Sequence, residues 1–422
     1  MKLRIAHYIH RYPPALGGAE AYFARLSQFL CQQGDQIQVH TSNALALEAF
    51  WHTQAAKLPS GKAHVAGVQI HKHPIRTFAM RRYFMHALSY VVPTSLKSLC
   101  MPVNPIMPSM WDQASQLQKI DIVHASAFPY GWPLRCAVRL ADRLKIPFVL
   151  TPFLHLGDIG NQSNRTRTAY LSPPLKWILG RADRILAQTQ LERLAILETG
   201  IPEQRVLYQG LGVEPAECTG GQRSRADARW QLPVGVPRVG HLANLSDEKG
   251  SIDLIRAAQK LWHQGLALHC VLAGPSMPNF RRYWRSLEPK YRDRIALLGA
   301  LPPEQKADFY AAIDLFALPS RSDSFGLVLL EAWVNQIPCI GYRAGGLAEV
   351  IQHEMDGLLV PCGDWQALAL ALQRLLQSEA ERQRMGQRGN SKCRHHFQWL
   401  DKLQFVRNVY LELCSTDYSG FK

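Results

Sequence analysis

The stretch PSRSDSFGLVLLEA, residues 319–332, joins an apolar run at 315–318 to a helical pattern at 326–335. A short apolar run bounded by Pro and Ser is typical of a buried strand, and Gly326 stands where the chain turns into the helix. A helix start offers free backbone N–H groups and the positive end of the helix dipole, both suited to phosphate oxygens. The stretch therefore predicts a strand–loop–helix unit with an anion-binding turn.

Two carboxylates flank this turn. Asp323 precedes the helix and Glu331 lies about a turn and a half into it. One interpretation is that both face a cleft and hold hydroxyl groups at two ends of one ligand. The structural alternative is that Asp323 or Ser324 caps the helix while Glu331 lies on a solvated face. The local sequence leaves both open.

The same alternation of strand and helix extends in both directions and lapses once, at a segment rich in Gly, Pro and charge. We predict an α/β fold of two Rossmann-like, doubly wound parallel-sheet domains that face a central cleft, with ligands at the carboxyl ends of the strands. The predicted parts are an N-terminal domain at 1–212, a linker at 213–237, a C-terminal domain at 238–395 and a final segment at 396–422.

The composition is that of an ordinary globular protein, with 47% hydrophobic and 19% charged residues among 422. The first residues, 1–9, do not form a secretory signal, and no run approaches the roughly 20 apolar residues of a spanning helix. The nine cysteines are scattered and never paired as Cys-x-x-Cys. This pattern favours a reducing cytoplasm and argues against a disulfide framework or a zinc site.

The formal net charge is +15. Residues 72–184 hold 15 Lys and Arg against 5 Asp and Glu, a net of +10. Nucleic acid, anionic lipid and a phosphorylated substrate are the candidate partners. No nucleic-acid-binding motif is visible, so we expect no nucleic acid partner.

Basic and large apolar residues interleave at 76–111, followed by several prolines. This segment is expected either to dock on an anionic membrane surface, bringing the protein to a lipid-linked acceptor, or to be an insertion packed on the first domain.

The 319–332 stretch resembles the carboxylate-pair motif of glycosyltransferase family 4, a group of retaining enzymes with the GT-B fold. The family pattern is Pro-Ser-x-x-Glu-x-Phe-Gly, with a second Glu eight residues after the first; here the first acid is Asp323. The resemblance implies that Asp323 contacts the transferred sugar and Glu331 the ribose hydroxyls. It implies that the backbone of Gly326 and Leu327 contacts the donor diphosphate and that Phe325 belongs to the donor site.

Two further stretches of the cleft are similar to the family. Lys249, in LSDEKG at 245–250, matches a lysine that pairs with the donor diphosphate, while Asn244 stands where the family has Arg. Arg321 and Arg343 are candidates, by position, to replace that missing cation. His155 matches a histidine that faces the transferred sugar.

Gly17 and Gly18 resemble the family's Gly-Gly loop near the donor phosphates and the acceptor. His124, also expected at a strand end, is interpreted as lining the cleft. Other family-like stretches follow in the family's order from residue 5 to about 410. The tail at 396–422 is similar to the family's last helix, which crosses back to the first domain.

The resemblance implies a retaining hexosyltransferase that moves a sugar from a nucleotide-sugar donor to a glycan or lipid-linked acceptor. It implies no metal and no other cofactor, with Lys249, Asp323 and His155 as the catalytic residues. The expected setting is polysaccharide biosynthesis in the cytoplasm, with peripheral attachment to the inner face of the membrane. Three alternatives stay open: a nucleotide-sugar-binding pseudo-enzyme, because Asn244 and Asp323 depart from the pattern; synthesis of a free disaccharide or its phosphate; and nucleic-acid binding.

Overall fold

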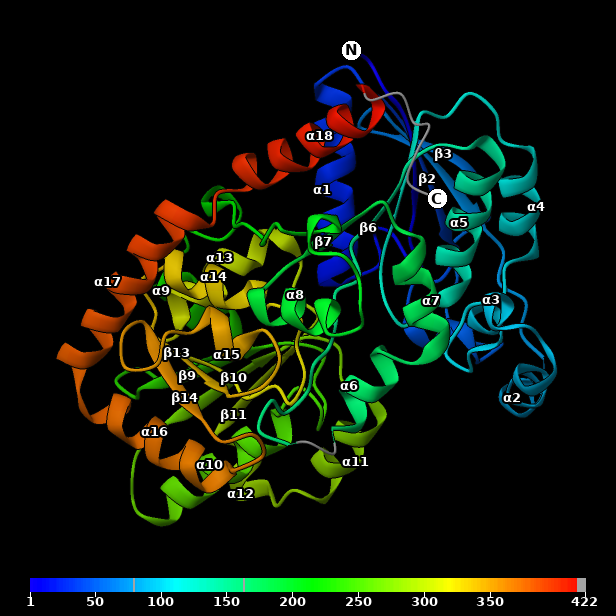
Figure 1. Cartoon of the computed structure of the whole chain (residues 1–422). Helices are drawn as coiled ribbons and strands as arrows, with labels where there is room; N and C mark the ends of the chain where they lie inside the picture. The colour runs from blue at the N-terminus through cyan, green and yellow to red at the C-terminus, as the bar shows by residue number, and fades with distance from the viewer. Residues whose placement is uncertain (79, 162–163, 416–422) are drawn as a thin grey trace. The chain divides into compact units, whose positions relative to one another are not determined.

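Two sheets, one for each half of the chain, organise the computed structural model, which describes residues 1–78, 80–161 and 164–415 (Figure 1). Of these described residues, the first unit comprises those within 1–154, 167–209 and 403–415, and the second those within 155–166 and 210–402. Each unit is a parallel or mostly parallel sheet with helices on both faces. This confirms the predicted fold class of two Rossmann-like α/β domains.

The segment at 213–237, expected as a linker, lies within the second unit and contains the helix α9 (Arg223–Trp230). The buried carboxylate of Asp308 holds this helix. It accepts hydrogen bonds from the Arg225 Nε at 2.7 Å and from the backbone N–H of Gln222 at 3.1 Å. A charged pair between distant residues makes this segment part of a packed unit, which composition alone does not reveal.

The first unit has an eight-stranded sheet in the order β3-β4-β2-β1-β5-β6-β7-β8, in which only the β3–β4 pair is antiparallel. The order reverses direction between β1 and β5. The strands are β1 (Arg4–Tyr8), β2 (Gln36–Ser42), β3 (Gly61–Val65), β4 (Val68–His73), β5 (Ile122–Ala125), β6 (Phe148–Leu150), β7 (Arg184–Ala187) and β8 (Val206–Tyr208).

Alternate residues of β1 point to opposite faces of this sheet. His7 points to the face covered by α1 and α18, where it bonds Ser27 and Tyr410; α5 covers the other face together with α4 and α7 (Figure 1). The helices are α1 (Gly18–Gln32), α2 (Arg81–Val91), α3 (Thr94–Lys97), α4 (Pro108–Gln116), α5 (Gly131–Leu144), α7 (Pro173–Arg181), α8 (Gln190–Leu197) and α18 (Trp399–Ser415), with 3-10 turns η1 (Leu47–Phe50), η2 (Ser98–Cys100) and η3 (Glu203–Arg205).

Three histidines of β2 and β4 are buried together. The rings of His40 and His71 stack at 4.8 Å between centroids, and the Nδ1 of His40 lies 3.5 Å from the Nε2 of His73. Burial lowers the pKa of His73 to about 4, with a smaller contribution from His71. These imidazoles are therefore neutral in the folded protein at pH 7.

We predict that the protein loses stability on mild acidification. An unfolded His binds its proton near pH 6.5, but His73 resists protonation down to about pH 4, so its contribution is complete above pH 6.5 and is lost as the pH falls toward 4. His73 alone should lower the free energy of unfolding by about 2 kcal/mol between pH 7 and pH 5. Urea unfolding of the wild type and of His73→Asn at pH 8, 7 and 5 measures this difference. An equal drop from pH 7 to 5 in both proteins would contradict it.

The second unit has six parallel strands in the order β11-β10-β9-β12-β13-β14. Numbered from its own first strand this is 3-2-1-4-5-6, the doubly wound order whose ligands bind where the direction reverses, here between β9 and β12. The strands are β9 (Arg238–Leu242), β10 (His269–Ala273), β11 (Ile295–Gly299), β12 (Leu315–Leu318), β13 (Cys339–Tyr342) and β14 (Gly357–Val360).

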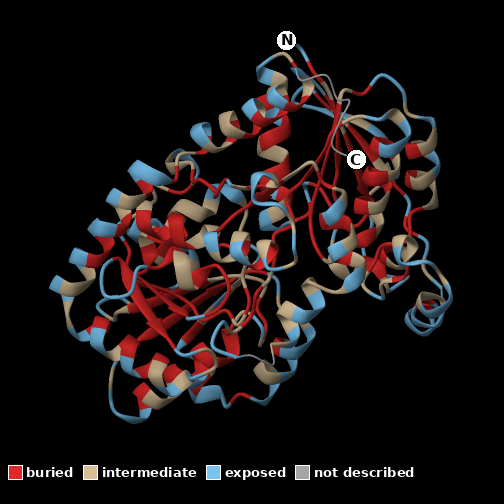
Figure 2. Ribbon diagram, viewed as in Figure 1, coloured by how far each residue is buried: buried red, intermediate tan, exposed pale blue. Residues whose placement is uncertain are grey.

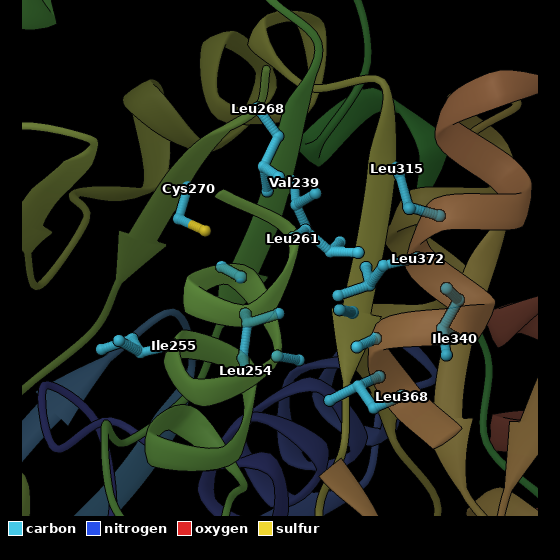
Figure 3. Packing of buried hydrophobic residues seen from close by; sticks show 14 of the residues in the cluster. Val239, Leu254, Ile255, Leu261, Leu268, Cys270, Leu315, Ile340, Leu368 and Leu372 are labelled. Carbon is cyan, nitrogen blue, oxygen red and sulfur yellow. The ribbon is translucent and has the colours of Figure 1, made fainter. Parts of the chain in front are cut away.

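One hydrophobic core of the second unit lies between this sheet and two helices on one face. Leu254 and Leu261 of α10 pack with Leu368 and Leu372 of α16 against strand residues such as Val239 (Figure 3). The helices and remaining 3-10 turns of this unit are α9, η4 (Pro215–Glu217), α10 (Ser251–His263), α11 (Pro278–Ser286), α12 (Pro289–Arg292), η5 (Pro303–Gln305), α13 (Lys306–Ala312), α14 (Leu327–Val334), α15 (Leu347–Val350), α16 (Trp365–Gln377) and α17 (Glu379–His396); α6 (Arg165–Tyr170) spans the point where the chain leaves this unit.

The inner strands of both sheets are buried almost throughout, whereas the edge strand β3 and the outer faces of the helices are exposed (Figure 2). Within the described ranges, no helix is both long enough and apolar enough to cross a bilayer.

Candidate functional site

The loops that follow β9 and β12 meet at the point where the strand order of the second unit reverses. The backbone N–H of Arg321 donates to the carbonyl of Glu248 at 2.9 Å. Gly250 has a φ of +72°, and a Cβ at that position would collide with the carbonyl of Pro319. The glycine therefore lets the two loops touch, which brings the segments at 244–250 and 319–326 together.

We predict that Gly250→Ala destabilises the protein by at least about 2 kcal/mol, because it combines left-handed strain with a collision against backbone. The matched control is Gly265→Ala, at the other end of α10. Gly265 has a φ of +81° but no atom within 4 Å of its Cβ position, so only the strain applies. Urea unfolding of both variants measures the difference. Equal losses of stability would show that the close approach of the loops costs nothing.

Lys249 and Asp323 form an ion pair across these two loops. The Lys249 Nζ lies 2.7 Å from the Asp323 Oδ2 and 3.4 Å from the carbonyl of Ser322. The two side chains are 23% and 18% exposed, so a ligand can still reach them. Burial would raise the pKa of Asp323, but Lys249 and His155 outweigh it and the pKa is lowered. The carboxylate stays charged at neutral pH and holds the ammonium in place.

His155 belongs to the same group of residues. It begins the segment 155–166, which packs in the second unit: the N–H of Gly345 donates to the carbonyl of Gly157 at 2.7 Å, and the N–H of Gly346 to that of Asp323 at 2.8 Å. Burial, with Lys249 nearby, lowers the pKa of His155 to about 4 although Asp323 acts in the opposite direction. His155 is thus a neutral imidazole beside the Lys249–Asp323 pair.

The helix α14 begins at Leu327, directly after this loop. Gly326 caps it with a φ of +88°, and a Cβ there would lie 2.6 Å from the side chain of Leu347. Phe325 is buried, with its ring 5.8 Å from that of Phe397, so its side chain anchors the turn. The backbone of Gly326 and Leu327 presents the positive end of the helix beside Lys249.

Glu331, one turn further along α14, has two partners from α13. Lys306 Nζ lies 2.8 Å from its Oε1, and the Tyr310 hydroxyl donates to its Oε2 at 2.8 Å. The structure thus rejects the solvated-face alternative for Glu331. Lys306 and Tyr310 were not predicted from the sequence to be site residues. The two residues are four positions apart, so a sequence pattern can place both on one face of a helix. That pattern does not show that both contact Glu331.

The loop after β9 carries Asn244, which is partly buried. Arg321, a candidate to replace the missing arginine, is bound to the buried carboxylate of Asp253. That carboxylate also accepts from the Tyr342 hydroxyl at 2.9 Å. Arg321 is therefore held in a structural ion pair with Asp253. Arg343, the other candidate for the missing cation, is exposed.

In the first unit, Gly17 and Gly18 form the start of α1. A Cβ on Gly17 would collide with the carboxylate of Glu20, which folds back over the helix start. Glu20 is buried and pairs with Arg11 at 2.6 Å, and Arg11 donates to the carbonyl of Leu16 at 3.0 Å. This buried ion pair and the Arg11 hydrogen bond fix the loop that precedes the two exposed glycines.

The interpretation of His124 as cleft-lining is wrong. His124 is fully buried at the centre of the first unit, where it bonds Tyr410 and, at 2.8 Å, the Thr151 hydroxyl. Tyr410 belongs to α18. Sequence patterns do not show that a helix nearly 300 residues further along the chain covers the end of this strand.

Comparison with known proteins identifies both halves. Residues 17–212 match the family model of the glycosyl transferase 4-like domain, and residues 222–392 match that of the glycosyl transferases group 1. The chain is 27% identical over 388 residues to a D-inositol 3-phosphate glycosyltransferase of Nocardia farcinica, covering 88% of this chain and 80% of that protein. It is 32% identical over 181 residues to the N-acetyl-α-D-glucosaminyl L-malate synthase of Bacillus anthracis, covering 43% of this chain and 46% of that one.

Solved structures share the fold. Sucrose-phosphate synthase from Thermosynechococcus elongatus superimposes with a TM-score of 0.75 at 20% identity, over 98% of this chain and 99% of that one. HepE from Anabaena, in complex with UDP, superimposes with a TM-score of 0.71 at 18% identity, over 97% and 100%. The order of the two matched models along the chain, the two α/β units and these likenesses agree: the chain belongs to the group 1 glycosyl transferases, glycosyltransferases of the family-4 type with the GT-B fold.

Proposed function

We propose that the protein transfers a sugar from a nucleotide-sugar donor to a glycan or lipid-linked acceptor, with retention of anomeric configuration. The observation that carries this proposal is the Lys249–Asp323 pair, 2.7 Å apart, beside the start of α14 and at the switch point of the sheet. Positive charge and free N–H groups in this position suit a diphosphate. The UDP-bound HepE structure, which shares the fold, supports a nucleotide in such a site.

The proposed chemistry uses the donor's own leaving group as base. The bond between the anomeric carbon and the diphosphate oxygen breaks while the acceptor oxygen bonds to the same face of that carbon, and the acceptor proton passes to the leaving diphosphate. Lys249 and the N–H groups of α14 stabilise the charge that develops on the diphosphate. Neutral His155 and Asp323 would hold the sugar's hydroxyl groups, and Glu331 the ribose. We propose no metal, because Lys249 and the helix dipole of α14 supply positive charge at the diphosphate.

Two finer points belong to the proposal. The nine cysteines, all free thiols, support a reducing cytoplasmic location. The basic first unit supports an acceptor held at an anionic membrane surface, as in the assembly of a polysaccharide on a lipid carrier.

The test has two steps. First, thermal unfolding of the purified protein is measured with UDP, GDP and ADP and their sugars, for the wild type and for Lys260→Ala, a lysine of α10 outside the site. One nucleotide should raise the Tm of both proteins. Second, the stabilising nucleotide sugar is incubated with candidate lipid-linked acceptors, and the product's anomeric proton is followed by NMR.

The outcomes distinguish the proposed retaining enzyme from its alternatives. Transfer with the donor's anomeric configuration supports the proposal. Inversion would overturn retention. Nucleotide binding without transfer or donor hydrolysis would favour the pseudo-enzyme, consistent with Asn244 in place of an arginine. No binding of any nucleotide would overturn the donor site.

A further inference from the structure

Large apolar side chains are exposed together at one place in the first unit. Of the 18 large hydrophobic residues that are exposed in the described part of the chain, six lie within residues 78–91, on and just before α2. We call them the α2 surface: Phe78, Met80, Tyr83, Phe84, Tyr90 and Val91. Contiguous exposed apolar residues mark an interaction site far more often than scattered ones do.

The opposite side of α2 explains why this face is free. Met85 packs in a small core with Cys100 and Ile106, and Leu88 and Val92 lie against it. The spacing of 85, 88 and 92 is that of one helix stripe. The apolar residues of the inward stripe thus pack against the first unit, and the outward residues are not needed to hold the helix there.

Arg81 fixes the start of this helix. It is buried, and its guanidinium donates to the backbone carbonyls of Phe50, Pro102 and Asn104. On the outer side, the rings of Phe78 and Phe84 meet edge to face at 5.8 Å, so the loop before α2 and the helix form one surface. The helix α2 lies at one end of the first unit, away from its sheet, and most of its ribbon is exposed (Figures 1 and 2).

The charge around this surface has one sign. Between Glu48 and Asp112 the sequence has no acidic residue and seven basic ones: Lys57, Lys62, Lys72, Arg76, Arg81, Arg82 and Lys97. Arg76 and Arg82 are exposed beside the apolar residues. A second copy of this surface would bring like charges together, because a two-fold interface places the same patch of each subunit against the other. An anionic partner fits better.

We propose that the α2 surface binds an anionic phospholipid bilayer. The tyrosines at 83 and 90, 74% and 73% exposed, are the residue type that prefers the boundary between headgroups and acyl chains. Eleven residues make α2 too short to span a bilayer, which takes about 20, but suit a helix that lies in its surface. This inference deepens the proposed function by stating how a lipid-linked acceptor is reached, and its lipid binding is measurable without any transfer.

The experiment is co-sedimentation of the full chain with vesicles of phosphatidylcholine alone and of phosphatidylcholine mixed with phosphatidylglycerol. The wild type should bind the mixed vesicles and not the neutral ones. Phe84→Ser combined with Tyr90→Ser should weaken binding by at least about tenfold. Arg76→Glu combined with Arg82→Glu should weaken it by about fivefold or more for each charge, less so in high salt.

The matched control is Leu370→Ser combined with Leu400→Ser, two leucines of the second unit that are 60% and 66% exposed. This variant should bind like the wild type. Absence of wild-type binding to anionic vesicles, or equal losses in the control, would overturn the proposal. So would a dimer in light scattering that the Phe84 and Tyr90 substitutions convert to monomer, since the surface would then serve a second copy.

Stabilisation by nucleotide is measured in the same variants and should stay unchanged, which also shows that they fold. Failed vesicle binding with intact nucleotide binding overturns only the membrane surface. Intact vesicle binding without nucleotide binding overturns only the proposed function.

Discussion

Lys249→Ala should lower kcat/KM by about 10²- to 10³-fold, the typical loss when one preorganised group that stabilises developing charge is removed. In the structure this ammonium lies 2.7 Å from the Asp323 carboxylate, so it is held where the diphosphate is expected rather than moving freely in solvent. Since the charge on the leaving diphosphate grows in the transition state, kcat should fall more than the affinity for the donor. Steady-state kinetics with nucleotide titration separates the two effects.

Two further variants interpret this result. Lys260→Ala removes a lysine of α10, the helix that follows the Lys249 loop, at a distance from the pair and should leave kcat unchanged. Asp323→Ala combined with Lys249→Ala should cost less than the sum of the single changes, because each single change leaves its partner without the opposite charge. A Lys249→Ala enzyme with a kcat near that of the wild type would show that another group stabilises the leaving group.

Glu331→Ala should weaken binding of the donor nucleotide by about 30- to 100-fold while changing kcat much less. The expected loss corresponds to one or two hydrogen bonds from ribose hydroxyls to a charged acceptor. Ribose is remote from the reacting carbon, so its contacts contribute equally to ground and transition states. Isothermal titration with the stabilising nucleotide gives the affinity, and kinetics at saturating donor gives kcat.

The neighbouring Lys306 tests whether geometry or charge matters at this position. Burial acts to lower the pKa of Lys306, but Glu331 outweighs it and the pKa is raised, so the ammonium stays charged at neutral pH. Lys306→Met should leave the carboxylate present but less well oriented, with an effect on affinity smaller than that of Glu331→Ala. Glu304→Ala, an exposed acid just before α13, should have no effect. Unchanged nucleotide affinity in Glu331→Ala would place the ribose elsewhere.

Local patterns predicted most of the second unit. The predicted helix at 326–335 is α14 at 327–334, with Gly326 as its cap, and the predicted strand at 315–318 is β12. These predictions succeeded because buried parallel strands and capped helices depend on hydrophobic periodicity and on glycine, which are local properties. Helix α9 was missed because its sequence is strongly polar and its stability comes from Asp308, about 80 residues away.

The candidate site shows the same division. The sequence by itself identified Lys249, Asp323 and Glu331 as charged residues at strand ends and a helix start, and placed them in a family whose models match the chain. It did not show that Lys249 pairs with Asp323, or that Lys306 and Tyr310 hold Glu331. It also did not show that the segment beginning at His155 joins the second unit.

The sequence therefore determined the alternation of elements, the family and the types of residue in the site. The tertiary structure decided which of these residues meet, and which histidines are sealed in a core instead of facing a ligand. The physical reason is that an ion pair or a buried hydrogen bond depends on where two distant segments cross. Here that crossing depends on a backbone approach at Gly250 that only a residue without a Cβ permits.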